Sequence, residues 1–337
     1  MDDARHPLLS RATPLAQTEL EAFAEDARRR ALLPPAEFGH YEVQEIEAKS
    51  ALAVSGLPGN PYSLSPYVGC AHACVYCYVP DLLHVDRPRW GSYVMVKRNL
   101  PTLLAREMAR KPRGIVYLSA ATDAYQPAEA RHLVTRRCLE VLARRDWPLR
   151  LLTRSPLVKR DIDVLSRFSD ILVGLTIPTL DDDARRILEP DAPPIEGRLA
   201  AVRALADAGL RPFVNLVPAF PFTEKHTPER MARAFRDAGV AAVHAGAFQY
   251  LDILAPYLRE RAPPEMLRAL EDPEYNARMF AALRVACERE GVRFELIGPE
   301  PQRRAKREVR WVEGASGRRP ASVDGSGAKE TPPAEAP

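Results

Sequence analysis

Short apolar runs alternate with longer amphipathic stretches through much of the chain, between residues 115 and 247. The apolar runs are typical of strands in a parallel sheet, because both faces of such strands are buried. The expected strands cover residues 115–119, 149–153, 171–177, 212–217 and 241–247. Apolar residues at helical spacing predict helices between them, near residues 129–144, 159–168, 195–208 and 228–238. Gly209 and Gly239 follow the last two of these helices, where glycine commonly ends a helix.

This alternation predicts an α/β fold in which helices cover a parallel sheet. With about six strand–helix units, a partial or complete β/α barrel fits the pattern better than a doubly wound sheet. The functional side chains of such barrels follow the carboxyl ends of the strands. Those segments are therefore where a site is expected.

The two ends of the chain differ from this central pattern. Residues 15–33 form a charged stretch with helical spacing that ends at two prolines. A basic run at residues 303–307 leads into a segment rich in Gly, Ser, Pro, Ala and Glu, a composition that buries too little apolar surface to offset the entropy of ordering. We therefore expect an N-terminal extension over residues 1–50, a core domain over 51–300, and a basic and then disordered tail over 301–337.

Composition sets the context in which the site must work. The 337 residues include 48 basic and 45 acidic side chains, and a net charge of +3 does not by itself indicate a nucleic-acid-binding protein. No stretch approaches the roughly 20 apolar residues of a membrane-spanning helix. The first residues also lack the cationic flank and apolar run of a secretory signal. These features predict a cytoplasmic protein with no membrane partner, in a compartment that keeps thiols reduced.

Three of the five cysteines form a C-x3-C-x2-C cluster at Cys70, Cys74 and Cys77. An odd number of cysteines in a reducing compartment argues against a closed set of disulfides and favours metal binding. A structural zinc ion would need a fourth ligand, for which only His72 or His84 is near in the sequence. A [4Fe–4S] cluster held by three thiolates would leave one iron open to a substrate or cofactor. The spacing therefore predicts an iron–sulfur cluster, with zinc as the alternative.

The segment from Cys70 to Tyr78, with Tyr76 directly before the third cysteine, resembles the signature of the radical S-adenosylmethionine superfamily. The further segments that resemble its spore photoproduct lyase-like branch are residues 122–127, 153–161 and 189–194. This resemblance implies a partial (β/α)6 TIM-like barrel with a [4Fe–4S] cluster and S-adenosylmethionine as cofactors. It also implies that a small ferredoxin or flavodoxin reduces the cluster, which cleaves S-adenosylmethionine to a 5′-deoxyadenosyl radical that abstracts hydrogen from a substrate.

The resemblance also implies roles for the residues at the strand ends. Thr122 and Asp123 match the segment that binds the amino group of S-adenosylmethionine, and Arg154 matches a cation beside its carboxylate. Thr176 matches a hydroxyl near the ribose or carboxylate, and the ring of Tyr76 would pack near the adenine. The alternatives are structural: a helix cap for the aspartate, an ion pair for the arginine, a strand residue for Thr176 and loop packing for the tyrosine.

The sequence departs from the lyase in one respect. The lyase carries a cysteine near the end of its second strand that returns hydrogen to the product radical, whereas residues 119–122 of this chain contain no thiol. Cys138 and Cys287 lie in helical patterns, where buried structural cysteines are common. The chain is therefore not expected to be a true photoproduct lyase.

Two functions remain. The first is a radical S-adenosylmethionine enzyme that acts on an unidentified substrate, with nucleic acid suggested by the branch and by the basic run at residues 303–307. The second is a non-catalytic zinc or iron–sulfur module that binds nucleic acid or protein. Colour, iron content and release of 5′-deoxyadenosine would separate them.

Overall fold

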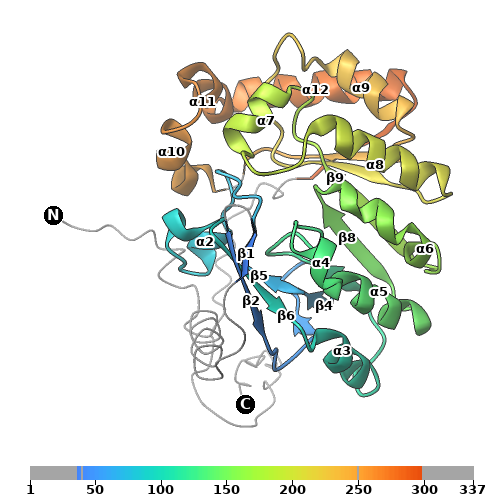
Figure 1. The fold of residues 1–337 in the computed structure, drawn as a ribbon. Coiled ribbons are helices and arrows are strands. Elements are labelled where there is room, and N and C mark those ends of the chain that lie inside the picture. Colours follow the sequence, from blue (N-terminus) through green and yellow to red (C-terminus); the bar gives the residue numbers. More distant parts are fainter. Residues whose placement is uncertain (1–35, 39–40, 249, 298–337) are drawn as a thin grey trace, which may run out of the picture. The chain divides into compact units, whose positions relative to one another are not determined.

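The computed structural model describes residues 36–38, 41–248 and 250–297 (Figure 1). The charged stretch expected at residues 15–33, the basic run at 303–307 and the tail after it lie outside this part. The boundaries expected for the extension and the core domain stay predictions.

The main element of the fold is an eight-stranded sheet in the order β12-β11-β10-β9-β8-β7-β4-β3. Its strands are β3 (Ala53–Val54), β4 (Tyr62–Leu64), β7 (Val116–Leu118), β8 (Leu149–Thr153), β9 (Ile171–Thr176), β10 (Phe213–Leu216), β11 (Ala242–Ala245) and β12 (Arg293–Leu296). Neighbours from β4 to β12 pair in parallel, whereas β3 pairs antiparallel with β4. Because β3 and β12 stand at the two ends of this order, the sheet is an open, partial barrel, which confirms the fold expected from the sequence.

Helices connect the parallel strands, and Figure 1 shows α5, α6 and α8 along the outer face of the sheet. The connecting helices are α4 (Glu129–His132), α5 (Val134–Arg144), η2 (Pro156–Asp161), α6 (Ile162–Leu165), α7 (Asp182–Leu188), α8 (Ile195–Asp207), α9 (Pro228–Asp237), α10 (Leu251–Arg259), α11 (Pro264–Glu271) and α12 (Pro273–Arg289). On β7, Val116 and Leu118 are fully buried in the core, while Tyr117 between them lines a cavity on the inner face. No helix among the described residues is both long and apolar enough to cross a bilayer.

Glycine ends two of the expected helices as predicted. Gly209 follows α8 with a φ of 82°, and Gly239 follows α9 with a φ of 75°. Two other helices differ from the expectation. Leu133, with a φ of 55°, divides the helix expected at residues 129–144, and the helix expected at residues 159–168 begins earlier as the 3₁₀ turn η2.

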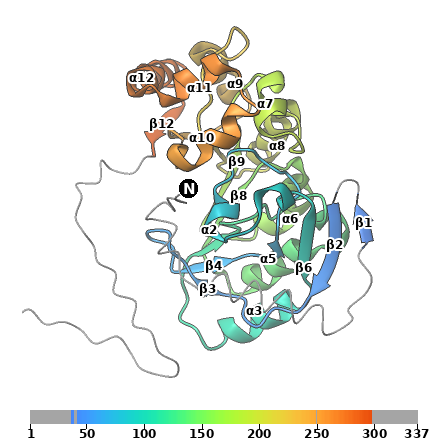
Figure 2. The ribbon, with the colours of Figure 1, turned by 90° about the vertical axis from the view of Figure 1, so that its left-hand side faces the viewer.

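A second sheet, in the order β1-β2-β6-β5, was not indicated by the apolar pattern. Its strands are β1 (Ala36–Phe38), β2 (Tyr41–Ile46), β5 (Tyr67–Val68) and β6 (Tyr93–Lys97). The helices nearest to it in the sequence are α2 (Val79–Leu82), η1 (Arg87–Arg89) and α3 (Leu100–Met108). Figure 2 shows β1, β2 and β6 side by side, far from α10 to α12. Since β5 directly precedes the cysteine segment, this sheet fixes where that segment begins.

Glu107 at the end of α3 anchors the chain between the two sheets. Its carboxylate accepts hydrogen bonds from the amides of Ala51 and Leu52 at 2.7 and 3.0 Å, and from Lys111 Nζ at 2.9 Å. Partial burial alone would raise the pKa of Glu107, but these hydrogen bonds lower it to about 2.

The Glu107→Gln variant is expected to lose about 2 kcal/mol of unfolding free energy at pH 7, as for hydrogen bonds to a charged group. Because the folded pKa lies below the ordinary value of 4.5, this stabilisation is present above that value and is lost as the pH falls toward 2. Urea unfolding of the cluster-free protein should therefore show the difference between wild type and variant shrinking below about pH 5. A difference that stays constant down to acid pH would contradict this role of the carboxylate.

Candidate functional site

A cavity of about 560 Å³ opens where the parallel strands end. The cysteine segment that follows β4 and β5, the ends of β7 and β8, and the inner faces of β9 to β11 all line it. The predicted site residues all lie among its lining: Cys70, Cys74, Cys77, Tyr76, Thr122, Asp123, Arg154 and Thr176. The structure thus brings together residues that are more than a hundred positions apart in the sequence, at the edge where barrels carry their chemistry.

The cysteine segment turns tightly as it leaves β5. Gly69 has a φ of 80°, and a Cβ atom there would lie 2.4 Å from the carbonyl oxygen of Tyr93 on β6. Only glycine therefore fits at this point. Further on, the amide of Cys77 donates to the carbonyl of Cys74 at 3.0 Å, and the amide of Val75 donates to Leu188 O at 2.9 Å. The first bond turns the segment back on itself, the second ties it to the end of α7, and all three cysteines line the cavity.

The thiols are largely shielded from water. Cys70 and Cys74 are buried and Cys77 is half-buried. Burial raises the pKa of all three thiols to about 12, although the charge of Arg154 opposes this effect. Cysteine binds metals as the thiolate, so a metal that replaces the proton relieves this cost. The group is suited to metal binding rather than to acid–base chemistry.

The residues available as ligands bear on the choice between a zinc ion and an iron–sulfur cluster. Among the described residues, no three of His, Cys, Asp and Glu converge closely enough to hold a single metal ion. His72, between the first two cysteines, is fully buried with Nδ1 3.5 Å from Asp123 Oδ2. A [4Fe–4S] cluster held by three thiolates leaves one iron open, whereas a structural zinc ion needs four ligands. The three cysteines that line the cavity match the ligand number of a cluster with one open iron.

Tyr76 packs into the wall of the cavity. Its ring meets Phe220 and Phe248 edge-to-face, with both centroid distances at 5.8 Å. Its hydroxyl donates a hydrogen bond to Glu189 Oε1. These contacts fix the ring beside the cysteines. Tyr76 therefore has at least the packing role that was the alternative to a contact with adenine.

Asp123 joins the ends of β7 and β8. Its Oδ1 accepts hydrogen bonds from Thr153 Oγ1 at 2.6 Å and from the amide of Tyr125 at 2.8 Å, and its Oδ2 accepts from the amide of Arg154 at 2.8 Å. Burial alone would raise the pKa of Asp123, but His72 and Arg154 lower it, together with these hydrogen bonds. The carboxylate is therefore a buried anion. It does not cap α4, whose N-cap residue is Ala128.

Two hydroxyl groups beside Asp123 lack partners. Ser119 Oγ and Thr122 Oγ1 are buried and make no hydrogen bond, although both residues line the cavity. Buried hydroxyls without partners are rare, because each costs free energy unless something binds it. A ligand with polar groups in the cavity would satisfy both.

Arg154, Glu189 and Arg198 form a buried charge cluster behind the thiols. Arg198 Nη2 donates to Glu189 Oε2 at 2.5 Å, and both side chains are fully buried. Arg198 also donates to the carbonyls of Thr176 and Pro193, both at 2.9 Å. Arg154 Nε lies 3.5 Å from Glu189 Oε1 without a hydrogen bond. Arg198 is thus engaged in the fold, whereas Arg154 keeps capacity to bind an anion.

Sequence reasoning missed other residues that shape the cavity. Arg87 donates to the carbonyls of Val75 and Cys77 at 3.1 and 2.6 Å and holds the far end of the cysteine segment. On the inner face of the sheet, Phe213 stacks on His244 with a centroid distance of 4.5 Å. No local pattern marks these residues, because each acts through partners distant in the sequence.

Comparisons with known proteins identify the family of the chain. Residues 64–235 match the family model of the Radical SAM superfamily. An uncharacterized protein of Methanocaldococcus jannaschii is 35% identical over 181 residues, which cover 53% of this chain and 68% of the relative. An uncharacterized protein of Acidianus two-tailed virus is 31% identical over 200 residues, which cover 54% of this chain and 65% of that protein.

Solved structures share the fold. Spore photoproduct lyase complexed with dinucleoside spore photoproduct superposes with a TM-score of 0.59 at 17% identity, over 76% of this chain and 82% of that one. A mutant of that lyase with bound AdoMet and dinucleoside spore photoproduct also gives 0.59, at 16% identity, over 86% of this chain and 96% of that one.

Proposed function

The chain belongs to the radical S-adenosylmethionine superfamily, whose cofactors are a [4Fe–4S] cluster and S-adenosylmethionine, and we propose that it cleaves the latter reductively to start radical chemistry on a substrate. One observation carries the proposal: Cys70, Cys74 and Cys77 line the same cavity as buried, unpartnered polar groups at the ends of β7 and β8. When bound, the reduced cluster supplies the electron that cleaves the sulfonium and yields a 5′-deoxyadenosyl radical. The other side chains of the cavity would bind and orient S-adenosylmethionine and the substrate.

The residues of the cavity are suited to the two ends of S-adenosylmethionine. Arg154, whose Nε has no hydrogen bond, would bind the carboxylate, since guanidinium groups pair well with carboxylates. The hydroxyls of Ser119 and Thr122 would bind the ammonium group, beside the buried negative charge of Asp123. Asp123 already accepts three hydrogen bonds, and a carboxylate has room for about four. Its main contribution would therefore be its charge.

The remaining predicted contacts lie on the other walls. Thr176, at the end of β9, would offer a hydroxyl to the ribose or carboxylate, while its carbonyl is held by Arg198. Tyr76 would present the part of its ring not covered by Phe220 and Phe248 to the adenine. Apolar packing around both residues would exclude water from the radical.

We propose that the substrate occupies the part of the cavity formed by β10 and β11, where Phe213, Asn215 and His244 line the wall. A nucleic-acid substrate is supported by two exposed tyrosines. Tyr78 follows the last cysteine and lies 5.0 Å from Tyr250 between ring centroids, and exposed aromatic rings are platforms on which bases stack. Enzymes of this superfamily need an electron donor, and we propose a small ferredoxin or flavodoxin.

Anaerobic reconstitution of the full chain tests the proposal. The protein is expected to turn brown, to hold one [4Fe–4S] cluster, and to release 5′-deoxyadenosine from S-adenosylmethionine after reduction with dithionite. Addition of DNA, RNA or peptide should raise the rate for the substrate class alone. A colourless protein that holds one zinc ion and releases no 5′-deoxyadenosine would instead support the non-catalytic module.

A further inference from the structure

The segment of residues 123–129, which leads from β7 into α4, holds the cysteine segment through Gln126. The carboxamide of Gln126 accepts a hydrogen bond from the amide of Ala71 at 2.9 Å and donates one to the carbonyl of Gly69 at 3.2 Å. These two peptide groups flank Cys70 on either side. Gln126 is fully buried, so water does not compete for these bonds.

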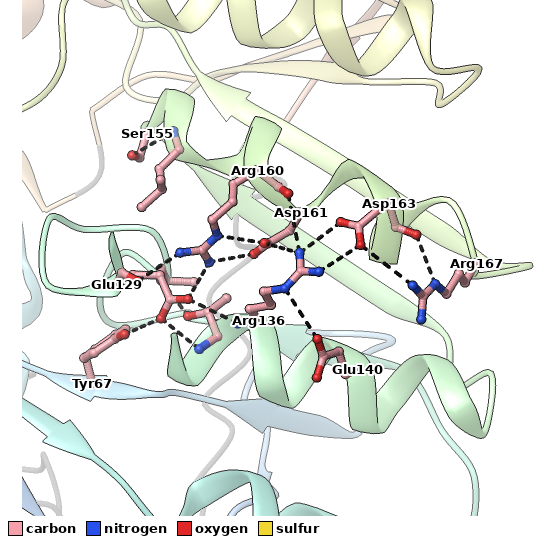
Figure 3. A network of polar contacts seen from close by, with 12 residues as sticks. Tyr67, Glu129, Arg136, Glu140, Ser155, Arg160, Asp161, Asp163 and Arg167 are labelled. Carbon is pink, nitrogen blue, oxygen red and sulfur yellow. Dashed lines mark hydrogen bonds and ion pairs between the residues drawn. The ribbon is translucent and has the colours of Figure 1, made fainter. Parts of the chain in front are cut away.

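The same segment also holds the strand before Cys70. Glu129 is fully buried and accepts hydrogen bonds from the hydroxyl of Tyr67 on β5, from the amide of Thr135 at 2.8 Å and from Arg160 Nη2 at 2.6 Å. Figure 3 shows Glu129 between Tyr67 on one side and Arg160 on the other. The chain leading to Cys70 is thus fixed at two points, Tyr67 and Gly69, by one segment.

At its other end the segment reaches the proposed S-adenosylmethionine contacts. Asp123 accepts from the Arg154 amide and from Thr153 Oγ1, as described above. Residues 123–129 therefore connect the chain beside Cys70 with the proposed S-adenosylmethionine contacts at the end of β8. The other cysteines are held differently, by Arg87 and by the carbonyl of Leu188. Gln126 acts on Cys70 alone.

We propose that Gln126 is a positioning residue that sets the stability and reduction potential of the cluster through Cys70. Its two hydrogen bonds fix the two peptide groups that flank Cys70, and so would fix the position of this ligand in a bound cluster. Partners beyond the direct ligands typically change metal affinity by about 10–100-fold, and hydrogen bonds to the sulfurs shift cluster potentials. The inference rests on the proposed role of Cys70 as a cluster ligand.

Two variants of Gln126 test this inference. Gln126→Met has a similar length but makes neither hydrogen bond. Gln126→Glu can still accept from the Ala71 amide, loses the donor to Gly69 and adds a negative charge. Thr135→Val is the matched control: the Thr135 hydroxyl donates to the carbonyl of Ala124 in the same segment at 2.6 Å and contacts Tyr67, and its loss leaves both hydrogen bonds of Gln126 in place.

The holoprotein is reconstituted anaerobically, and iron release to a chelator and the cluster potential are measured by absorbance and by an EPR-monitored redox titration. Gln126→Met is expected to release iron roughly tenfold faster, with a shifted potential, because the peptide groups beside Cys70 are no longer fixed. Gln126→Glu should release iron at an intermediate rate, with a lower potential. Thr135→Val should lower the melting temperature and leave release rate and potential as in wild type.

Wild-type release and potential in both Gln126 variants would overturn the inference. The same changes in Thr135→Val would also overturn it, since they would show a general effect of a loosened segment. A wild-type protein that takes up no cluster would refute the proposed function itself, and the two failures are thereby distinguished.

Discussion

The Cys74→Ala variant is expected to lose both the brown colour and the release of 5′-deoxyadenosine. A cluster held by three thiolates has no spare protein ligand, and alanine offers no donor atom. Cys74 is buried at the centre of the segment, and the other cysteines, Cys138 and Cys287, lie in α5 and α12. Iron content after anaerobic reconstitution and 5′-deoxyadenosine after dithionite reduction should both fall to background.

Cys138→Ala is the control for this experiment. Cys138 is fully buried in the hydrophobic core and does not line the cavity. Loss of its sulfur should lower stability by about 1 kcal/mol, as for most point changes, and leave iron content and cleavage unchanged. Cleavage retained in Cys74→Ala, or lost equally in Cys138→Ala, would contradict the assignment of the cluster ligands.

The sheet was largely predictable because its strands are continuous apolar runs. The strand expected at residues 149–153 is β8 itself, and the expectations for β7, β9 and β10 differ by one residue at their ends. The four-stranded sheet escaped prediction because its central pair joins residues 41–46 to residues 93–97. Pairing of this kind depends on contacts across about fifty residues, which no local pattern records.

The residues of the site also fall into those that the sequence identified and those that it did not. Cys70, Cys74 and Cys77 form a local motif, and Arg154 and Thr176 are marked by their place at or after strand ends, so the sequence identified them as candidates. Gln126 lies in the segment of residues 122–127 that resembles the branch, but the sequence indicated no role for it, because that role depends on a partner segment fifty-five residues earlier in the chain. Local chemistry is thus readable from the sequence, whereas the residues that hold it in place require the fold.

The Glu189→Gln variant is expected to lose about 3–5 kcal/mol of unfolding free energy, because it leaves the buried charge of Arg198 uncompensated. The pair is separated by 2.5 Å, and neither side chain is exposed. Burial alone would raise the pKa of Glu189, but the charges of Arg198 and Arg154 lower it, so the residue is held as the anion. Urea unfolding of the cluster-free protein at neutral pH measures the loss.

Asp163→Asn provides the comparison, since Asp163 pairs with Arg136 but is about half exposed. Removing a surface ion pair costs at most about 1 kcal/mol, so this variant should remain close to wild type. The effect of Glu189→Gln should also extend to the cavity, because Glu189 accepts from Tyr76 and balances Arg154 beside the thiols. If the two variants unfold alike, Glu189 does not stabilise the fold as a buried anion. A large loss confined to Glu189→Gln would show that this buried carboxylate stabilises the fold as an anion.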